Sequence, residues 1–187
     1  MMDERSLSTL PPDLPAPVDD GAAAHLAGTR LPHVALPATD GSTVDLAAIP
    51  GLVVVFAYPR TGRPGEPSLV ADWDAIPGAR GCTPHTSGFR DLHAEFAALG
   101  ARVFGLSTQD TAYQREMVER LHVPFPVLSD ERLALANALR LPTMEVAGQV
   151  LLKRIAWIAR DGAIERVFYP VFPPNENASA VLAALRG

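Results

Sequence analysis

The chain contains a single cysteine, Cys82, in the stretch GARGCTPHTSGFRD (residues 78–91). A lone cysteine cannot form a disulfide within its own molecule. A thiol becomes a nucleophile when it ionises readily, which a helix N-terminus and nearby cations promote. Both are expected here, because Cys82 opens a predicted helix and Arg80 lies two residues before it. Free cysteines are often buried and inert, but the flanking Gly81 and Thr83 are not an apolar run and favour a reactive thiol.

Two other kinds of chemistry have weaker support. Cys82 and His85 have the spacing of half a metal site, but no second Cys/His pair lies at ligand spacing, so we expect no metal and no other cofactor. A cysteine hydrolase needs a base histidine oriented by a third group, and spacing singles out none of the other histidines: His25, His33, His93 and His122. We expect His85 to be an exposed polar residue on the first helical turn, with electrostatic tuning of the thiol as the alternative.

The composition is that of an ordinary globular protein, with 187 residues of which 48% are hydrophobic and 20% charged. That length fits one domain with a large core. The net charge of −5 disfavours a nucleic-acid partner, which would need a basic face. No apolar run approaches the roughly 18 residues that span a bilayer, and the opening MMDERSLSTLPPDL lacks the apolar core of a secretory signal. Because a single cysteine fits a reducing compartment, the sequence predicts a cytoplasmic protein without a membrane partner.

The chain divides into an arm and a domain. Residues 1–30 are rich in Pro, Asp and Ala without sustained periodicity, and predict a partly disordered N-terminal arm. Residues 31–187 form the predicted domain. Within it, residues 52–59 (LVVVFAYP) predict a central strand buried on both faces. Residues 60–81 contain too many turn-forming residues for a regular element and predict a long loop.

Beyond this loop the pattern alternates between helices and strands. One helix of about four turns is predicted from Cys82 to just before Gly100, because apolar residues recur at helical spacing: Phe89, Leu92, Phe96 and Leu99. Asp40-Gly41 predicts a hairpin turn. Further strands are predicted at residues 101–108, 125–129, 151–160 and 163–169, and further helices near 113–121, 131–140 and 177–185. This order predicts an α/β fold with a central mixed β-sheet flanked by α-helices.

Two segments together carry a family resemblance, VVVFAYPR (residues 53–60) followed by GCTPHTSGFRD (residues 81–91). They resemble the peroxiredoxins, specifically the Q-type (bacterioferritin-comigratory) group, and the resemblance extends from about residue 31 to the C-terminus. It implies a thioredoxin-like fold and a thiol-dependent peroxidase, an antioxidant oxidoreductase. In this family a peroxidatic cysteine, here Cys82, attacks the peroxide O–O bond and becomes a sulfenic acid.

The resemblance also implies roles for three other residues. The family's active-site arginine corresponds to Arg154 in KRIAWIARDG, where a fixed cation favours the thiolate and stabilises the leaving oxygen. The proline that shields the thiolate corresponds to Pro59. The family threonine three residues before the cysteine is Ala79 here, which leaves Thr61 as the candidate hydroxyl that orients the peroxide, if the insertion at residues 61–76 loops out. We expect that insertion to narrow access to the site or to offer a partner surface.

Ser87 occupies the position five residues after Cys82 where the family often has a resolving cysteine. Serine cannot form that disulfide, so we expect an external thiol such as thioredoxin, glutaredoxin or glutathione to regenerate Cys82. The sequence thus predicts a one-cysteine peroxidase that reduces hydrogen peroxide and organic hydroperoxides. The alternative is a redox-sensing or interaction protein that uses the same cysteine without steady-state turnover. We expect a monomer, with a disulfide-linked dimer through Cys82 as the alternative.

Overall fold

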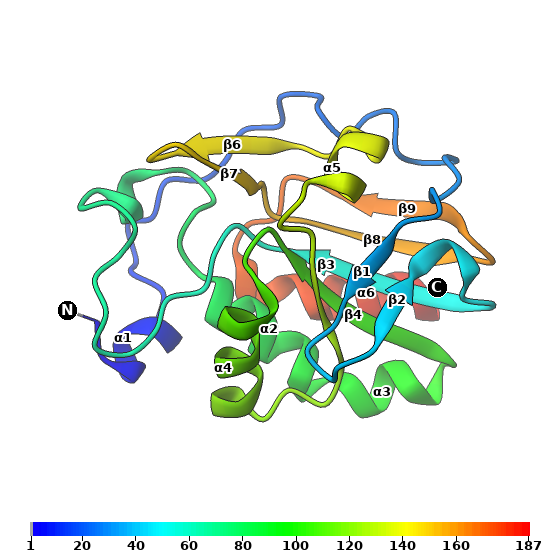
Figure 1. Cartoon of the computed structure of the whole chain (residues 1–187), viewed down its shortest axis with the longest axis horizontal. Coiled ribbons are helices and arrows are strands. Elements are labelled where there is room, and N and C mark those ends of the chain that lie inside the picture. The colour runs from blue at the N-terminus through cyan, green and yellow to red at the C-terminus, as the bar shows by residue number, and fades with distance from the viewer. Residues whose placement is uncertain (1) are drawn as a thin grey trace.

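A five-stranded mixed β-sheet forms the centre of the computed structural model, which describes residues 2–187 (Figure 1). Its strand order is β5-β4-β3-β8-β9. The central strand β3 (Leu52–Ala57) is parallel to β4 (Ala101–Ser107), which is parallel to β5 (Val127–Ser129). On its other side, β3 is antiparallel to β8 (Ile155–Arg160), which is antiparallel to β9 (Ala163–Phe168).

Strand β3 is buried on both faces, as its continuous apolar sequence predicts. Val53, Val55 and Ala57 belong to one hydrophobic cluster, whereas Val54 and Phe56 belong to another on the opposite face. Successive side chains of a strand point to opposite faces, so a strand covered on both sides is apolar at every position. The run of apolar residues therefore marks the middle of the sheet.

Four helices cover the face of the sheet to which Phe56 contributes: α2 (Cys82–Asp91), α3 (His93–Ala98), α4 (Thr111–Leu121) and α6 (Asn177–Arg186). The rings of Phe56 and Phe89 stack with centroids 4.3 Å apart, which ties α2 to β3. Phe96 of α3 continues the stack at 5.6 Å from Phe89. Such aromatic pairs contribute roughly 0.5–1.5 kcal/mol beyond the area that they bury. These stacked rings thus fix α2 relative to the sheet.

The opposite face is covered by α5 (Ala134–Leu139), by part of the N-terminal arm, and by the hairpin of β1 (Ala35–Pro37) and β2 (Thr43–Asp45). This hairpin turns at the predicted Asp40-Gly41, followed by the 3-10 helix η1 (Leu46–Ala48). Elements flank the sheet above and below (Figure 1), and the predicted α/β fold with a central mixed sheet is confirmed. No helix among residues 2–187 has the length and apolar character to cross a membrane.

The single helix predicted from Cys82 to Gly100 is wrong, because the chain breaks there into α2 and α3. Leu92 leaves the helical conformation, with φ −99° and ψ 6°. The change of direction keeps Phe96 in the core, while Leu99 is 37% exposed. Apolar periodicity locates the buried residues correctly, but it does not register one non-helical residue between two helical segments.

The strand predicted at residues 151–160 is divided into two. Its first part belongs to β7 (Gln149–Leu152), which pairs with β6 (Thr143–Val146) in a separate hairpin. Ala147 and Gly148, with φ of 50° and 74°, form the turn, as two-residue hairpin turns of this kind require. The sequence analysis missed this hairpin, whose signal was the Ala-Gly pair between two apolar segments. As a result, Arg154 lies just before β8 and not inside a strand.

The long loop predicted at residues 60–81 is confirmed, with one short 3-10 helix, η2 (Trp73–Ala75), inside it. Trp73 is buried in a small cluster with Leu151 of β7, and the partly buried Ile76 packs against it. The loop therefore rests on the β6–β7 hairpin through its own apolar contacts.

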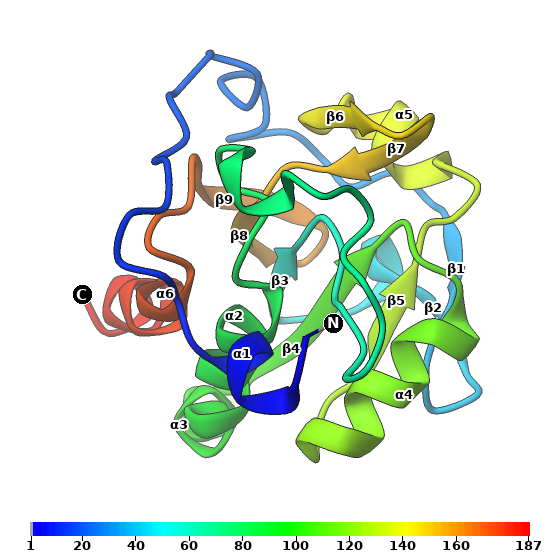
Figure 2. The same ribbon diagram turned by 90° about the vertical axis from the view of Figure 1, so that its left-hand side faces the viewer.

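The N-terminal arm follows the outside of the domain, and helix α1 (Glu4–Ser8) lies over the start of α2 (Figure 2). Leu7 of α1 is buried, and so is Leu26 further along the arm. The Gly28 N–H donates to the Ile164 carbonyl at 2.8 Å, which joins the end of the arm to β9. The partial disorder of the arm and the domain boundary near residue 31 stay predictions.

We expect Gly81→Ala to destabilise the protein more than Gly65→Ala does. Both glycines have positive φ, 105° and 81°, where a side chain costs roughly 1–2 kcal/mol. A Cβ at Gly81 would also lie 2.5 Å from Cγ of Pro174 in η3 (Pro174–Glu176), whereas nothing lies within 4 Å of one at Gly65. Overpacking adds roughly 1–3 kcal/mol. The free energies of unfolding in urea test this, and equal losses in the two variants would contradict the close contact at Gly81.

Candidate active site

The candidate site lies at the end of the inner strands of the sheet, where β3 ends and β8 begins. Because β3 and β8 are antiparallel and Ala57 pairs with Ile155, residues that follow β3 meet the residue that precedes β8. Thr61 follows the end of β3, and Arg154 is the residue immediately before β8. Cys82 reaches the same place from the loop, as the first residue of α2. The fold thereby gathers three segments that are far apart in sequence.

Cys82 begins α2 immediately after a sharp turn of the backbone. Gly81 makes this turn with φ 105°, a conformation that residues with a side chain rarely adopt. The free N–H groups of a first helical turn carry partial positive charge, which favours an anion close to them. The Cys82 side chain is 3% exposed, and its Sγ lies 3.7 Å from the carbonyl oxygen of Ala79.

Arg154 places a positive charge against the cysteine. Its Nη2 lies 3.3 Å from Sγ of Cys82, and the whole residue is 3% exposed. The same nitrogen lies within hydrogen-bonding distance, 3.1–3.3 Å, of three carbonyl oxygens that share its two hydrogens with the sulfur: those of Gly78, Ala79 and Arg80. A guanidinium is effectively always charged and presents its donors in a rigid fork. This arrangement can stabilise a thiolate and any negative charge that develops on a group bound beside it.

His85 is completely buried, so the expectation of an exposed residue on the first helical turn is wrong. Helix α6 covers it, and Asn177 at the start of α6 places Oδ1 2.8 Å from its Nε2. Its Nδ1 lies 3.0 Å from Nη1 of Arg154. Because arginine only donates, Nδ1 accepts and the proton resides on Nε2, which donates to Asn177. Burial and the charge of Arg154 hold the pKa of His85 well below its usual range, so the ring is neutral at pH 7.

Thr61 is buried and lines the same pocket as Cys82. Its hydroxyl and its backbone N–H both donate to Oε1 of Gln109, at 3.1 and 3.0 Å, and Nε2 of Gln109 donates back to the Thr61 carbonyl at 3.2 Å. With its proton directed at Gln109, the hydroxyl can offer lone pairs to a donor in the pocket. The sequence analysis missed Gln109; its only signal was a polar residue two positions after the end of the buried strand β4.

Pro59 lies next to the Cys82 pocket in the chain, and the Arg80 side chain points away from the sulfur. Pro59 is buried after β3, and the lining of the Cys82 pocket includes the two residues that follow it, Arg60 and Thr61. The Arg80 guanidinium faces the arm and the loop instead of the sulfur. It pairs with Asp74 at 3.2 Å and donates to the carbonyl of Ser6. Arg80 therefore contributes its carbonyl group to the site, as an acceptor for Arg154.

The pocket above Cys82 is small, and three other parts of the chain form its walls. The arm contributes Met2 and Leu7, α4 contributes Tyr113, and the loop contributes a larger set that includes Thr61, Leu69 and Trp73. Its free volume is about 30 Å³.

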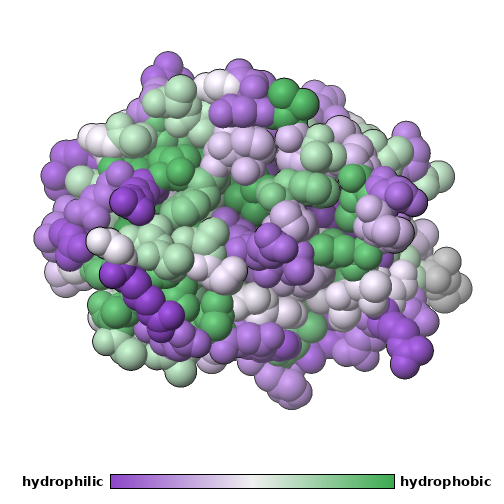
Figure 3. All heavy atoms as spheres, turned by 180° about the vertical axis from the view of Figure 1, so that it is seen from behind, coloured by the Kyte–Doolittle hydropathy of each residue, from purple (hydrophilic) through white to green (hydrophobic). Residues whose placement is uncertain are grey.

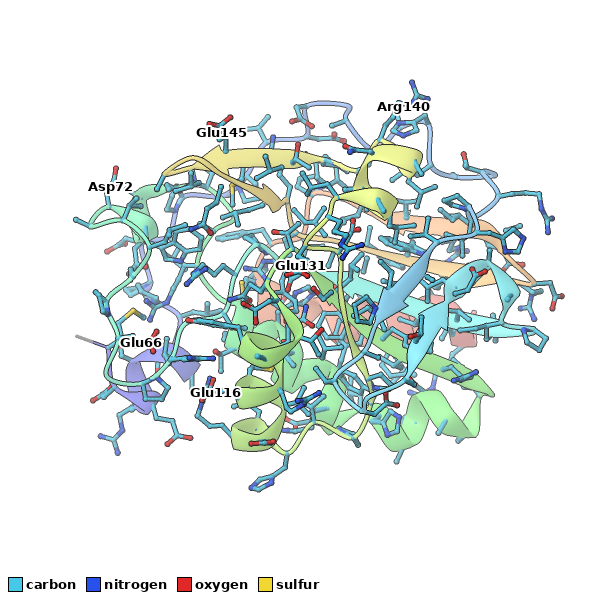
Figure 4. The ribbon with its side chains drawn as sticks, in the orientation of Figure 1. Glu66, Asp72, Glu116, Glu131, Arg140 and Glu145 are labelled. Carbon is cyan, nitrogen blue, oxygen red and sulfur yellow. The ribbon has the colours of Figure 1, made fainter. Side chains whose placement is uncertain are left out.

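The loop is tethered to α4 through Arg63. This side chain lies 3.9 Å from the centroid of the Tyr113 ring and pairs with Glu66 and Glu116, at 3.7 and 4.0 Å. Glu66 of the loop and Glu116 of α4 lie on the same side of the molecule (Figure 4). The contacts of Arg63 thus hold the loop as a wall beside the cysteine.

No group of three or more His, Cys, Asp or Glu side chains within residues 2–187 is arranged to hold a metal ion. The nitrogens of His85 are already bonded to Arg154 and Asn177. The reactive groups that the site offers are the Cys82 thiol, the Arg154 guanidinium and the Thr61 hydroxyl. A nucleophilic sulfur beside a fixed cation suits attack on a small electrophile that releases an anion.

Comparison with known proteins identifies the family. Residues 26–185 match the Redoxin family. Peroxiredoxin Q, chloroplastic, of Oryza sativa subsp. japonica is 26% identical over 85% of this chain and 66% of its own length, and peroxiredoxin bcp1 of Schizosaccharomyces pombe is 30% identical over 72% and 60%. The chain therefore belongs to the redoxin family, and the relatives that it matches are peroxiredoxins of the Q (BCP) group, as the resemblance predicted. The match spans less than two thirds of the length of these relatives.

Solved structures agree with this assignment. Peroxidoxin BcpB from Mycobacterium tuberculosis superposes with a TM-score of 0.67 at 26% identity, covering 86% of this chain and 96% of that protein. Peroxiredoxin Q of Xanthomonas campestris gives a TM-score of 0.68 at 24% identity, with coverages of 86% and 96%. These similarities confirm the predicted fold. Residues 2–25, which include α1, precede the part that the family matches.

We predict that His85→Leu slows the reaction of Cys82 with iodoacetamide at pH 7, whereas His85→Gln preserves it. Leucine leaves Nη1 of Arg154 without its acceptor, and a lost hydrogen bond of this kind costs roughly 1–3 kcal/mol, equivalent to roughly fivefold to 150-fold in rate. Glutamine can accept from Arg154 and donate to Asn177 in the same way. Equal rates in the leucine and glutamine variants would contradict a positioning role for His85.

The pH dependence of the free energy of unfolding gives a second test of His85. A histidine whose pKa is lowered by folding stabilises the protein above its unfolded pKa of about 6.5, and this contribution is lost as the pH falls below that value. Wild type should therefore lose more free energy of unfolding than His85→Gln between pH 7 and more acidic solutions. Parallel pH profiles for the two proteins would show that folding leaves the pKa of His85 unchanged, which would contradict the buried neutral ring.

Proposed function

We propose that the chain is a thiol-dependent peroxidase that uses Cys82 to reduce hydrogen peroxide and organic hydroperoxides. The observation that carries the proposal is the 3.3 Å contact between the Cys82 sulfur and the buried Arg154 guanidinium, beside a pocket that reaches the sulfur. The thiolate attacks one oxygen of ROOH, the O–O bond breaks, and an S–OH bond forms while RO⁻ leaves and takes up a proton. The sulfur is oxidised by two electrons and the peroxide is reduced.

Arg154, Thr61 and Pro59 support this step in different ways. Arg154 stabilises the thiolate before attack and the negative charge on the leaving oxygen during it. The Thr61 hydroxyl, held by Gln109, accepts a hydrogen bond from the peroxide O–H and so holds this oxygen, the one that the sulfur attacks, in place beside Cys82. Pro59, buried next to the pocket lining, limits the access of water to the thiolate.

An external thiol completes the cycle. The chain has no second cysteine, and Ser87 stands at the family's resolving position. The sulfenic acid condenses with an incoming thiol to give a mixed disulfide and water, and a second thiol then releases Cys82. Thioredoxin, glutaredoxin and glutathione are the candidate reductants.

A redox sensor is the second candidate function, and the burial of Cys82 favours it. A sulfur that is 3% exposed is difficult for a protein thiol to reach, so oxidation would persist without turnover. Steady-state consumption of peroxide with a thiol supports the enzyme, whereas a single stoichiometric oxidation supports the sensor.

We also propose a monomer in a reducing compartment such as the cytoplasm. On the face seen from behind, apolar residues lie in separate groups between polar ones (Figure 3), which is typical of monomeric surfaces. The burial of Cys82 disfavours a disulfide-linked dimer, and a single cysteine fits a reducing environment. Sedimentation before and after peroxide treatment tests the oligomeric state.

We expect wild-type protein without added thiol to consume about one equivalent of hydrogen peroxide per chain and to form a sulfenic acid that dimedone traps. With dithiothreitol, consumption should become catalytic. Cys82→Ser should consume none, because serine cannot be oxidised in this way, while Ser87→Ala should behave as wild type. Full turnover in Cys82→Ser would eliminate the proposed function.

We expect Thr61→Val to lower kcat/KM for hydrogen peroxide by roughly tenfold to a hundredfold, the effect of one lost hydrogen bond of about 1–3 kcal/mol. Valine preserves the shape but removes the acceptor. Thr61→Ser retains the hydroxyl and should recover most of the rate. If the valine and serine variants were equally active, the orienting role of Thr61 would be wrong.

A further inference from the structure

Met2 and Leu7 line the pocket above Cys82, although they precede the part of the chain that the redoxin family matches. Residues 2–10 are here named the arm tip. We propose that the arm tip restricts this pocket to small hydroperoxides, so that the protein prefers hydrogen peroxide to bulky organic hydroperoxides. This inference rests on the proposed peroxidase function and adds the size of its substrate.

Several contacts hold the arm tip against the loop. The Gly65 N–H donates to the Met2 carbonyl at 2.8 Å, and the Ser68 hydroxyl lies 3.1 Å from the Met2 sulfur. Leu7 is buried against Gly62, where an added Cβ would lie only 2.8 Å from its Cδ2. The arm tip and the loop therefore pack together closely and leave no room for a further carbon between them.

Arg80 connects the arm tip to the nucleophile. Its guanidinium donates to the carbonyls of Ser6 and Thr9 and pairs with Asp74 of the loop. Its own carbonyl accepts from Arg154 at 3.1 Å. Because Arg80 is two residues from Cys82, the position of the arm tip is coupled through one residue to the geometry around the sulfur.

The volume of the pocket above Cys82 decides which peroxides can bind beside the sulfur. Met2 and Leu7 of the arm tip line the pocket together with Leu69 and Trp73 of the loop. The free volume is about 30 Å³, and a single water molecule needs roughly 10–15 Å³ of such volume. The pocket thus has room for a species of two oxygen atoms. An aromatic or long-chain substituent on the peroxide requires Leu7 to move.

The central test compares kcat/KM for cumene hydroperoxide with kcat/KM for hydrogen peroxide in wild type, Leu7→Ala and Gly62→Ala. Leu7→Ala removes part of the wall, and Gly62→Ala forces the Leu7 side chain to shift without altering the arm sequence, because the new Cβ would lie 2.8 Å from its Cδ2. We expect the ratio to rise at least about tenfold in both, equivalent to roughly 1.4 kcal/mol. Leu14→Ala is the matched control, because Leu14 belongs to the same arm but lines a different cavity; its ratio should equal that of wild type.

A second measurement separates this inference from the peroxidase assignment. The ratio of the rates of Cys82 alkylation by the bulky N-phenylmaleimide and by iodoacetamide reports access to the thiol without peroxide chemistry, because ionisation of Cys82 affects both rates. We expect Leu7→Ala to raise the maleimide rate relative to the iodoacetamide rate by at least about tenfold. An unchanged alkylation ratio in both Leu7→Ala and Gly62→Ala overturns the role of the arm tip, even if peroxidase activity is present. A changed ratio without any peroxidase activity supports the wall and rejects the proposed function.

Discussion

A buried arginine keeps its charge in any surroundings, and leaving that charge without partners costs several kcal/mol. Arg154 meets this constraint by donating to His85, to the Cys82 sulfur and to the carbonyls of residues 78–80. Those three carbonyls belong to the turn that leads directly into Cys82. The contacts that compensate the buried charge therefore also fix the backbone before the nucleophile, so the stability of this region and the geometry of the site have the same origin.

The sheet explains why these groups meet. Antiparallel pairing of β3 with β8 brings the end of one strand beside the start of the other, and α2 is locked to β3 by the stacked rings of Phe56 and Phe89. Helix α6 adds Asn177, whose Oδ1 accepts the hydrogen bond from Nε2 of His85. The partners of Arg154 thus come from α2 and from the loop directly before it, and core packing positions α2 against the sheet.

The sequence predicted those elements whose structure neighbouring residues determine. The apolar run of β3, the Asp40-Gly41 turn and the helix that starts at Cys82 were all visible. The break before Arg154 was not, because it depends on pairing between β6 and β7 in a stretch that otherwise resembles one strand. The burial of His85 also escaped prediction, since its cover comes from Asn177, 92 positions later. Arg80 was expected near the sulfur because of its sequence distance, but the arm competes for its side chain.

The placement of the arm tip has a practical consequence for handling the protein. Met2 lies in the lining of the pocket, and the C-terminus lies on the opposite side of the molecule (Figure 1). Any peptide fused upstream of residue 2 begins at the rim of the site, where it can hinder entry or pull α1 away from α2. An affinity tag, fluorophore or immobilising linker belongs after Gly187, where α6 ends far from the cysteine.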